Sequence, residues 1–538
     1  MRNDFKHIEL FAGCGGMSLG LDAAGFELFM ANELSPMASE TFAFNLLGED
    51  LSQLAKQKTK SENVLWIKSV FGEENLKDRL RENPFDYSNG KYSDLNSKTQ
   101  FENKLVIGNI DHLLNFLAHN KNACHQLRKQ SIDLLSGGPP CQGFSLAGRR
   151  IKDDYKNLLP LSFAKFAGLI QPKVVLLENV KGITSPFKTD DGVNHYAWLE
   201  VAKAFSLKGF VPVCMLLNSK YFGVPQNRPR FILYAFRIDV FEKLKSRKNN
   251  TDLTNAILLN SFLFYQKVHN KRERLDEIKL TDISLYDIES DPNFFDGKLL
   301  PKLRTDKTKF LSAAAAIGDI TSTKKKYKIE EIKNEYALHL SNLFKPKFQT
   351  LFEELQNHEQ RRHSFKVKAR FRLYQALNNL NGLRQDAMQV ISGKCKEEEI
   401  FQKVFTAFKE EALLVKSDEK ETFEQPISLN SFKEYLKRIE SKKHSQRAIK
   451  SNEPAPAQMT IPDDLCHYST TELRTLTVRE MARFQSFPDW FIFRSKVTTG
   501  GHQRSFEVPQ YTQVGNAVPP MLAYELGKTV SNLLKSIE

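Results

Sequence analysis

Between residue 5 and about residue 236, short apolar runs alternate with helical or loop stretches. This alternation is typical of a parallel sheet whose strands are joined by crossover helices. Strands are predicted at His7 to Phe11, Leu28 to Ala31, Leu105 to Ile107, Ile132 to Leu135, Val174 to Leu177, Val213 to Leu217 and Phe231 to Phe236. The predicted fold class is therefore α/β, and ligands are expected at the carboxyl ends of the strands.

From about residue 240 to residue 470 the pattern changes to Lys-rich and helical Glu/Lys segments, such as KCKEEEIFQKVFTAFKEEALLV. Residues 361–372 alternate basic with apolar side chains, which predicts a strand. Its basic face would meet phosphates or guanines, or it would simply be solvated, and the pattern does not choose between the two. Compact patterning returns after a Pro-containing linker near residues 454–462. We therefore expect a first domain over residues 1–240, continued by 472–538, and a second over 241–471.

Composition limits the class of protein. A chain of 538 residues with 41% apolar residues has room for two domains. The formal net charge of +14 favours a polyanionic partner, although simple solubility charge is the alternative. The six cysteines are scattered and form no close Cys/His pairs, so we expect reduced thiols, no metal site and a cytoplasmic location. Nowhere is there an apolar run long enough to span a bilayer, so membrane insertion is not expected.

A glycine loop follows the first predicted strand, with the sequence Phe11-Ala12-Gly13-Cys14-Gly15-Gly16. Glycines let the backbone turn sharply and approach a ligand closely. Glu33 ends the second strand, at about the distance where an acidic side chain meets a ribose hydroxyl. No phosphate-binding lysine follows the loop, so a nucleoside is favoured over a nucleoside triphosphate. A nicotinamide site or a simple tight turn stays open.

Three candidate chemical groups follow three later strands. Cys141 lies in the Pro-Pro loop of Ser136-Gly137-Gly138-Pro139-Pro140-Cys141, Glu178 ends the fifth strand, and Gln226-Asn227-Arg228-Pro229-Arg230 precedes the last. A nucleophile, a carboxyl group and two guanidinium groups are therefore predicted at one edge of the sheet.

These motifs resemble those of the cytosine-5 DNA methyltransferases. In the order of that family, the chain carries FAGCGG, ANE, GNID, GGPPCQGFS, ENV, QNRPR, LTVREMARFQSFPDWF and QVGNAVPP. The resemblance implies a Rossmann-like AdoMet methyltransferase fold, with a mixed, mostly parallel sheet and a smaller target-recognition domain. It also implies that the C-terminal segment folds back beside the first strand, so that the catalytic domain is discontinuous.

The resemblance implies S-adenosyl-L-methionine (AdoMet) as the cofactor. The residues that it carries over to the cofactor pocket are Phe11, Gly13, Gly15, Glu33, Asn516 and Val518. The family's third motif usually holds an acidic residue for the adenine amino group, whereas Asn109 stands there in this chain. An amide oxygen can still accept that hydrogen bond. A polar stretch from Gly48 to Lys104 has no counterpart in minimal family members.

The catalytic motifs of the family fall on Cys141, Glu178, Arg228 and Arg230, with Asn179 and Gln142 in support. Addition of the Cys141 thiolate to carbon 6 of cytosine would make carbon 5 nucleophilic. Glu178 would protonate or hydrogen-bond ring nitrogen 3, and Arg230 would hold the carbonyl oxygen at position 2. A bound water is the expected base for the carbon 5 proton. The loop Gln142 to Asn157 corresponds to the family's mobile loop, which closes over DNA.

Double-stranded DNA is the expected partner, and the target base must be flipped out of the stack to reach a thiol. The family is common in restriction-modification systems, so a separately acting restriction endonuclease is a possible partner, and the enzyme is expected to act as a monomer. A tRNA cytosine-5 methyltransferase and a non-catalytic DNA-binding regulator are the alternatives. A nicotinamide enzyme is disfavoured because it leaves the Pro-Pro-Cys loop and QNRPR unexplained.

Overall fold

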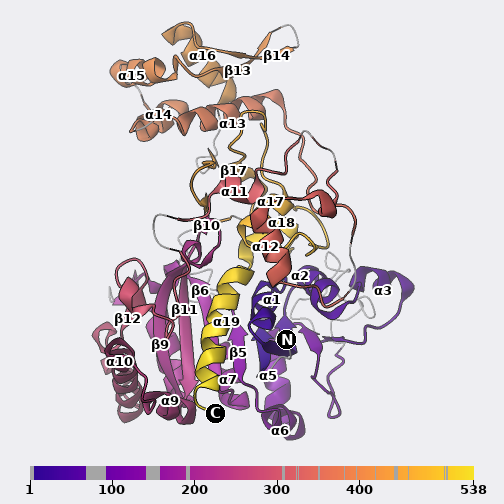
Figure 1. Cartoon of the computed structure of the whole chain (residues 1–538), viewed down its shortest axis with the longest axis vertical. Coiled ribbons are helices and arrows are strands. Elements are labelled where there is room, and N and C mark those ends of the chain that lie inside the picture. Colours follow the sequence, from indigo (N-terminus) through magenta and orange to yellow (C-terminus); the bar gives the residue numbers. More distant parts are fainter. Residues whose placement is uncertain are drawn as a thin grey trace.

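A nine-stranded sheet forms the lower half of the molecule (Figure 1). The computed structural model describes residues 5–67, 93–140, 158–188, 194–305, 309–322, 324, 326–348, 352–380, 382–395, 397–417, 420–440, 446–458, 460–501, 503 and 507–538. The strand order is β12-β9-β11-β6-β5-β1-β2-β4-β3. Their bounds are β1 Phe5–Leu10, β2 Phe26–Glu33, β3 Val64–Trp66, β4 Lys104–Ile107, β5 Leu134–Gly137, β6 Val174–Val180, β9 Phe210–Asn218, β11 Pro229–Arg237 and β12 Leu285–Asp287. Of these strands, β11 alone runs antiparallel to its neighbours β6 and β9.

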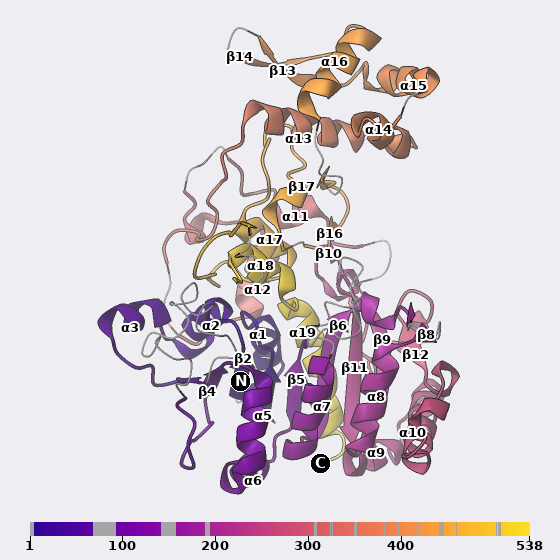
Figure 2. The ribbon, with the colours of Figure 1, turned by 180° about the vertical axis from the view of Figure 1, so that it is seen from behind.

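Both faces of the sheet are covered by helices, which is why its strands are continuously apolar. One face carries α5 Ile110–His119, α6 Lys121–Lys129, α7 Leu159–Ile170 and α8 Ala197–Leu207 (Figure 2). The other face carries α1 Gly16–Ala23, α9 Ile238–Lys245 and α19 Pro520–Lys535, and α10 Asp252–Asn270 contributes to both cores. Along β6, Leu176 packs into one core and Leu177 into the other. None of the helices in the described ranges is both long and apolar enough to cross a membrane.

The C-terminal helix α19 packs against α1, although the two lie at opposite ends of the chain (Figure 1). Glycines make this close approach possible. A Cβ atom on Gly20 would clash with the carbonyl oxygen of Pro520, and one on Gly527 would lie 2.7 Å from a side-chain carbon of Leu21. The return of the C-terminal segment, which the family resemblance implies, is present in the fold.

All seven predicted strands are confirmed, with ends shifted by a few residues. Two further strands, β3 and β12, extend the sheet at its two edges. β12 and α10 lie beyond residue 240, and residues between 238 and 300 contribute to the same core as the strands. The predicted boundary at residue 240 therefore does not coincide with the end of packing on the sheet.

Above the sheet lies a region that we call the junction, comprising residues 311–348, 352–358 and 449–517 where described. It contains α11 Ala313–Ile317, α12 Glu335–Leu343, α17 Val478–Phe484 and α18 Gln510–Asn516, together with the short strands β16 Ala455–Pro456 and β17 Leu465–Cys466. These elements share a core rich in Phe, with Phe484, Phe487, Phe491 and Phe493 fully buried. The aromatic stretch of the LTVRE motif is thus core.

The top of the molecule is a helical unit, residues 365–439, far from the sheet (Figure 1). It comprises α13 Phe365–Leu377, α14 Arg384–Ile391, α15 Glu398–Phe408, α16 Leu429–Ile439 and the hairpin of β13 Leu413–Ser417 with β14 Lys420–Glu424. The prediction of a strand over residues 361–372 is wrong, because α13 begins at Phe365. The predicted helix in KCKEEEIFQKVFTAFKEEALLV is confirmed as α15, but its last residues form β13 instead.

Candidate active site at the carboxyl edge of the sheet

Glu178 and Arg230 meet at the edge of the sheet that the sequence predicts. Across the antiparallel pair of β6 and β11, Glu178 lies opposite Ile232 and Arg230 lies opposite Val180. The Arg230 Nε atom is 2.7 Å from Glu178 Oε1, and the two side chains are 11% and 10% exposed. Burial lowers the pKa of the Arg230 guanidinium, while the adjoining carboxylate opposes that effect. A nearly dry pair of this kind holds both groups in one orientation.

The loop that leads to Cys141 is tied to the same edge. The Asn179 side-chain amide donates a hydrogen bond to the carbonyl oxygen of Pro139 at 2.9 Å, and Asn179 is buried. A Cβ atom on Gly138 would lie 3.1 Å from Glu178 Oε2, so the glycine leaves room beside the carboxylate. Asn179, for which a supporting role is predicted, therefore contacts the backbone of the loop that precedes Cys141. Cys141 itself, Gln142 and the predicted mobile loop lie outside the described residues.

At the end of β1, the backbone takes the left-handed conformation that the glycine loop predicts. Gly13 has φ +56° and Gly15 has φ +94°. Phe11 also has a positive φ of 56°, an unfavourable conformation for a side chain of this size, and such strain is often found at ligand sites. Nothing lies within 4 Å of a Cβ atom built on Gly13, so the loop faces open space there.

Glu33, at the end of β2, lies against this loop. Its Oε2 accepts a hydrogen bond from the Gly13 amide at 2.8 Å, and its Oε1 accepts one from the Ser35 amide at 2.7 Å. Burial raises the pKa of Glu33, and the hydrogen bonds from these two amides oppose that rise. The carboxylate is therefore held beside the glycine loop.

The other predicted cofactor residues are placed around this end of the sheet. Asn109 is the N-cap of α5, where its Oδ1 accepts a hydrogen bond from the Asp111 amide at 2.7 Å. Its amide oxygen thus has a structural role in addition to any role in ligand binding. Asn516 is exposed at the end of α18, whereas Val518 is buried and its carbonyl oxygen packs against Gly16.

Arg228 is buried against the C-terminal segment. It is 2% exposed, and its Nη2 atom donates to the carbonyl oxygens of Gly515 at 2.9 Å and Ala517 at 3.0 Å. Burial lowers its pKa well below the ordinary value, and the positive charge of Arg230 lowers it further. Arg228 thus joins the QNRPR turn to the C-terminal segment, whereas Arg230 pairs with Glu178, and the catalytic role of Arg228 stays a prediction.

Residues 5–67 and 98–532 match the family described as C-5 cytosine-specific DNA methylase. The chain belongs to this family. It is accordingly a DNA cytosine methyltransferase, and the resemblance read from the motifs is confirmed.

Relatives of this methyltransferase match almost its whole length. The type II methyltransferase M.DdeI of Desulfomicrobium norvegicum is 24% identical over 98% of this chain and 89% of its own length. The putative type II methyltransferase M.OihORF3336P of Oceanobacillus iheyensis is 24% identical over 97% of this chain and 94% of its own. A crystal structure of a putative DNA modification methyltransferase encoded within an E. coli prophage has a TM-score of 0.45 at 18% identity. It covers 99% of this chain and 100% of that one.

Gln226 is a residue of the methyltransferase that the sequence did not single out. Its side chain is fully buried, and its Nε2 atom donates to the Phe484 carbonyl oxygen and to Gln485 Oε1, both at 3.0 Å. Its Oε1 accepts from the Gln458 amide at 3.0 Å. Because Gln226 stands in the QNRPR motif, its place there was the available signal. The turn thus contacts the junction as well as the sheet.

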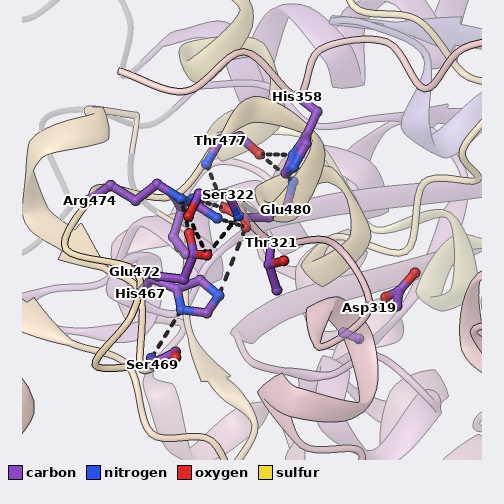
Figure 3. A network of polar contacts seen from close by, with 12 residues as sticks. Asp319, Thr321, Ser322, His358, His467, Ser469, Glu472, Arg474, Thr477 and Glu480 are labelled. Carbon is purple, nitrogen blue, oxygen red and sulfur yellow. Dashed lines mark hydrogen bonds and ion pairs between the residues drawn. The ribbon is translucent and has the colours of Figure 1, made fainter. Parts of the chain in front are cut away.

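A buried ionic network in the junction joins α17 to the segments that carry Ser322 and Glu472 (Figure 3). Arg474 donates to Glu480 through Nη1 and Nη2, at 2.8 and 2.7 Å, and its Nε donates to Glu472 at 2.5 Å. Glu472 in turn accepts from the Ser322 amide and hydroxyl at 2.6 and 2.7 Å. From α13, Gln375 donates to the carbonyl oxygens of residues 467 and 469. The helical unit is therefore hydrogen-bonded to the segment that carries Glu472 and Arg474.

Proposed function

We propose that the protein transfers methyl groups to carbon 5 of cytosine in a specific sequence of double-stranded DNA, with Cys141 as nucleophile. The observation that carries this proposal is the Glu178–Arg230 ion pair, which lies beside a Pro-Pro loop that Asn179 holds. Cys141 directly follows that loop in the sequence. A carboxyl and a guanidinium beside a nucleophile match the polar edge of a pyrimidine.

The Cys141 thiolate adds to carbon 6 of the target cytosine, and the new bond turns carbons 4 and 5 into an enamine. Glu178 donates a proton or a hydrogen bond to ring nitrogen 3, and Arg230 holds the carbonyl oxygen at position 2, so that both neutralise charge that the ring acquires. Carbon 5 then takes the methyl group. A water removes the carbon 5 proton, the double bond re-forms, and the thiolate leaves.

We propose AdoMet as the cofactor, and the residues at the glycine loop fit it. The open space before Gly13, the carboxylate of Glu33 and the absence of a phosphate-binding lysine after the loop suit an uncharged ribose diol. Phe11, Gly13, Gly15 and Glu33 would hold it, with Asn109 at the adenine and Asn516 and Val518 at the C-terminal side. Bound there, AdoMet supplies an electrophilic methyl group.

The division of labour follows the proposed domains. Residues 1–240 and 472–538 would carry catalysis, together with the part of 241–300 that packs on the sheet. The remainder of 241–471 would bind and read DNA, and the enzyme would act as a monomer on one flipped base. Since M.DdeI is named a type II methyltransferase, we propose that this protein modifies DNA in a restriction-modification system, beside a separate endonuclease.

The test is transfer of labelled methyl from AdoMet to mixed duplex DNA and to tRNA by the wild type and by Cys141→Ser. Cys124→Ser is the matched control, because Cys124 lies on α6, in a different part of the fold. We expect labelled 5-methylcytosine in DNA with the wild type and the control, and none with Cys141→Ser. Label in tRNA alone would overturn the substrate, and label independent of Cys141 would overturn the mechanism.

A further inference from the structure

Side-chain hydrogen bonds hold the main chain at the start of β11. Pro229 lies directly opposite Asn218, the last residue of β9. The amide of the preceding Arg228 donates a hydrogen bond to Asn218 Oδ1 at 3.0 Å. A side chain of β9 therefore holds the main chain just before β11 begins.

The rest of the turn is held from the same place. The Asn218 Nδ2 atom donates to the Asn227 Oδ1 atom at 2.7 Å. The amide and hydroxyl of Ser219 donate to the carbonyl oxygen of Arg228 at 3.1 and 3.3 Å. Both backbone polar groups of Arg228 are thus bound by residues 218 and 219. Asn218 is only 5% exposed, so water does not compete strongly for these bonds.

The hydrogen bonds from Asn218 and Ser219 to Arg228, which we call the clamp, hold the main chain where two like charges lie close together. Arg228 and Arg230 are separated by a single residue, and the charge of Arg230 contributes to the lowered pKa of Arg228. Their side chains nevertheless reach different partners, since Arg228 bonds to carbonyl oxygens near residue 516 and Arg230 pairs with Glu178. Repulsion between the two favours any backbone shift that separates them, and the bonds to Asn218 oppose it.

We infer that Asn218 is a positioning residue for methyl transfer. Its amide fixes the main chain at Asn227 and Arg228, and through it the site where Arg230 meets Glu178. This inference rests on the proposed function. A displacement of about 1 Å in a group that acts on the transition state costs on the order of a hundredfold in rate. Loss of the clamp therefore acts mainly on kcat, because the side chains that contact DNA and cofactor remain.

The test compares Asn218→Ala with Asn218→Asp. The alanine removes both the acceptor and the donor, and we expect kcat to fall about tenfold to a hundredfold. KM for DNA and the dissociation constant of S-adenosylhomocysteine should stay within about threefold of the wild type. The aspartate keeps an oxygen for the Arg228 amide, and the exposed Asn227 amide can rotate to donate to it. Its charge lies near Glu289, whose Oε1 is 3.4 Å from Asn218 Nδ2, but Lys220 is 3.0 Å from the same carboxylate and offsets the repulsion. We therefore expect Asn218→Asp to recover most of kcat.

Asn250→Ala is the matched control. Asn250 also makes three side-chain hydrogen bonds, to Arg247 and Leu244, and it follows α9 at the edge of the sheet opposite to Arg230. It should lower the unfolding temperature by a similar amount and leave kcat within about threefold. An equal loss of kcat in both alanine variants, an unchanged kcat in Asn218→Ala, or an Asn218→Asp variant as slow as the alanine would each overturn the inference. A wild type that methylates no DNA would instead overturn the proposed function.

Discussion

Arg474 lies between two buried carboxylates, so removing its charge should destabilise the protein in a way that depends on pH. The side chains of Arg474, Glu472 and Glu480 are 6%, 0% and 0% exposed. Replacing Arg474 by Met preserves most of the volume but leaves both carboxylates with neutral donors only. Breaking a buried pair by removing one partner costs about 3–5 kcal/mol, because an uncompensated charge stays behind.

The structure gives a second estimate of the magnitude. Burial alone would raise the pKa of Glu480, but the hydrogen bonds and charge of Arg474 lower it from 4.5 to about 2. A carboxyl group with this pKa stabilises the fold by about 3 kcal/mol at neutral pH, which agrees with the first figure. In the wild type this contribution is complete above pH 4.5 and is lost as the pH falls towards 2.

In Arg474→Met the pH dependence of the contribution of Glu480 to stability reverses. Without the guanidinium, burial raises the pKa of the Glu480 carboxyl group above the unfolded value. A group of this kind stabilises the fold fully below its unfolded pKa and loses that contribution as the pH rises. We therefore expect the stability deficit of the variant to be about 3–5 kcal/mol at pH 8 and to shrink towards pH 5.

The assay is urea unfolding of wild type and variant at four pH values from 5 to 8. The difference between the two proteins cancels the titration of distant buried groups such as His7, whereas His467, 3.9 Å from Glu480, belongs to the network that the difference measures. Arg237→Met is the control, since Arg237 pairs with Asp239 at the surface and should lose less than about 1 kcal/mol. A deficit below 1 kcal/mol at pH 8, or one that is constant from pH 8 to pH 5, would refute the reasoning.

Four further variants test other parts of the fold. Burial raises the pKa of Glu9 to about 8, so Glu9→Gln should stabilise the protein by about 3 kcal/mol at pH 7 and by little at pH 4.5. Thermal unfolding at both pH values checks this prediction, and equal gains in stability at the two pH values would contradict it. Gly20→Ala should lower the free energy of unfolding by about 1–3 kcal/mol, because the new methyl group meets the Pro520 carbonyl oxygen. An unchanged unfolding temperature would show that α19 moves away freely. Arg372→Met should destabilise the helical unit without weakening DNA binding, because Arg372 is buried. Arg362→Ala, at an exposed position, should weaken DNA binding in a filter-binding titration, and the opposite order of the two effects would contradict this prediction.

The sheet was predictable because its strands are buried on both faces. Seven of them are apolar runs bounded by loops, and such runs are visible without knowledge of their partners. β3 and β12 were missed because each has only three residues and owes its conformation to a neighbouring strand. A pattern of that length does not distinguish a strand from a loop.

The error at residues 361–372 has a different cause. Phe365, Val367, Ala369 and Phe371 fall on alternate positions, which favours a strand. From residue 371 to 377, however, every side chain of α13 is buried, because the hairpin and other helices of the unit surround it. Arg372 is included: its charge is paired with Glu411 at 2.8 Å rather than offered to DNA. Packing of the whole unit thus overrides a local pattern of four residues.

At the candidate site the motifs predicted that Glu178 and Arg230 lie at one edge of the sheet, but not the direction of each side chain. QNRPR looked like one basic element with two guanidinium groups for the substrate. In the fold, Gln226 reaches the junction, Arg228 reaches the C-terminal segment and Arg230 reaches Glu178. A turn that serves three separate parts of the chain needs a defined residue at nearly every position. In the sequence such a motif suggests groups that contact the substrate, although most of its contacts in the fold join parts of the chain. The same logic assigns Asn218 its role, since its side chain supplies the acceptor for the Arg228 amide within this turn.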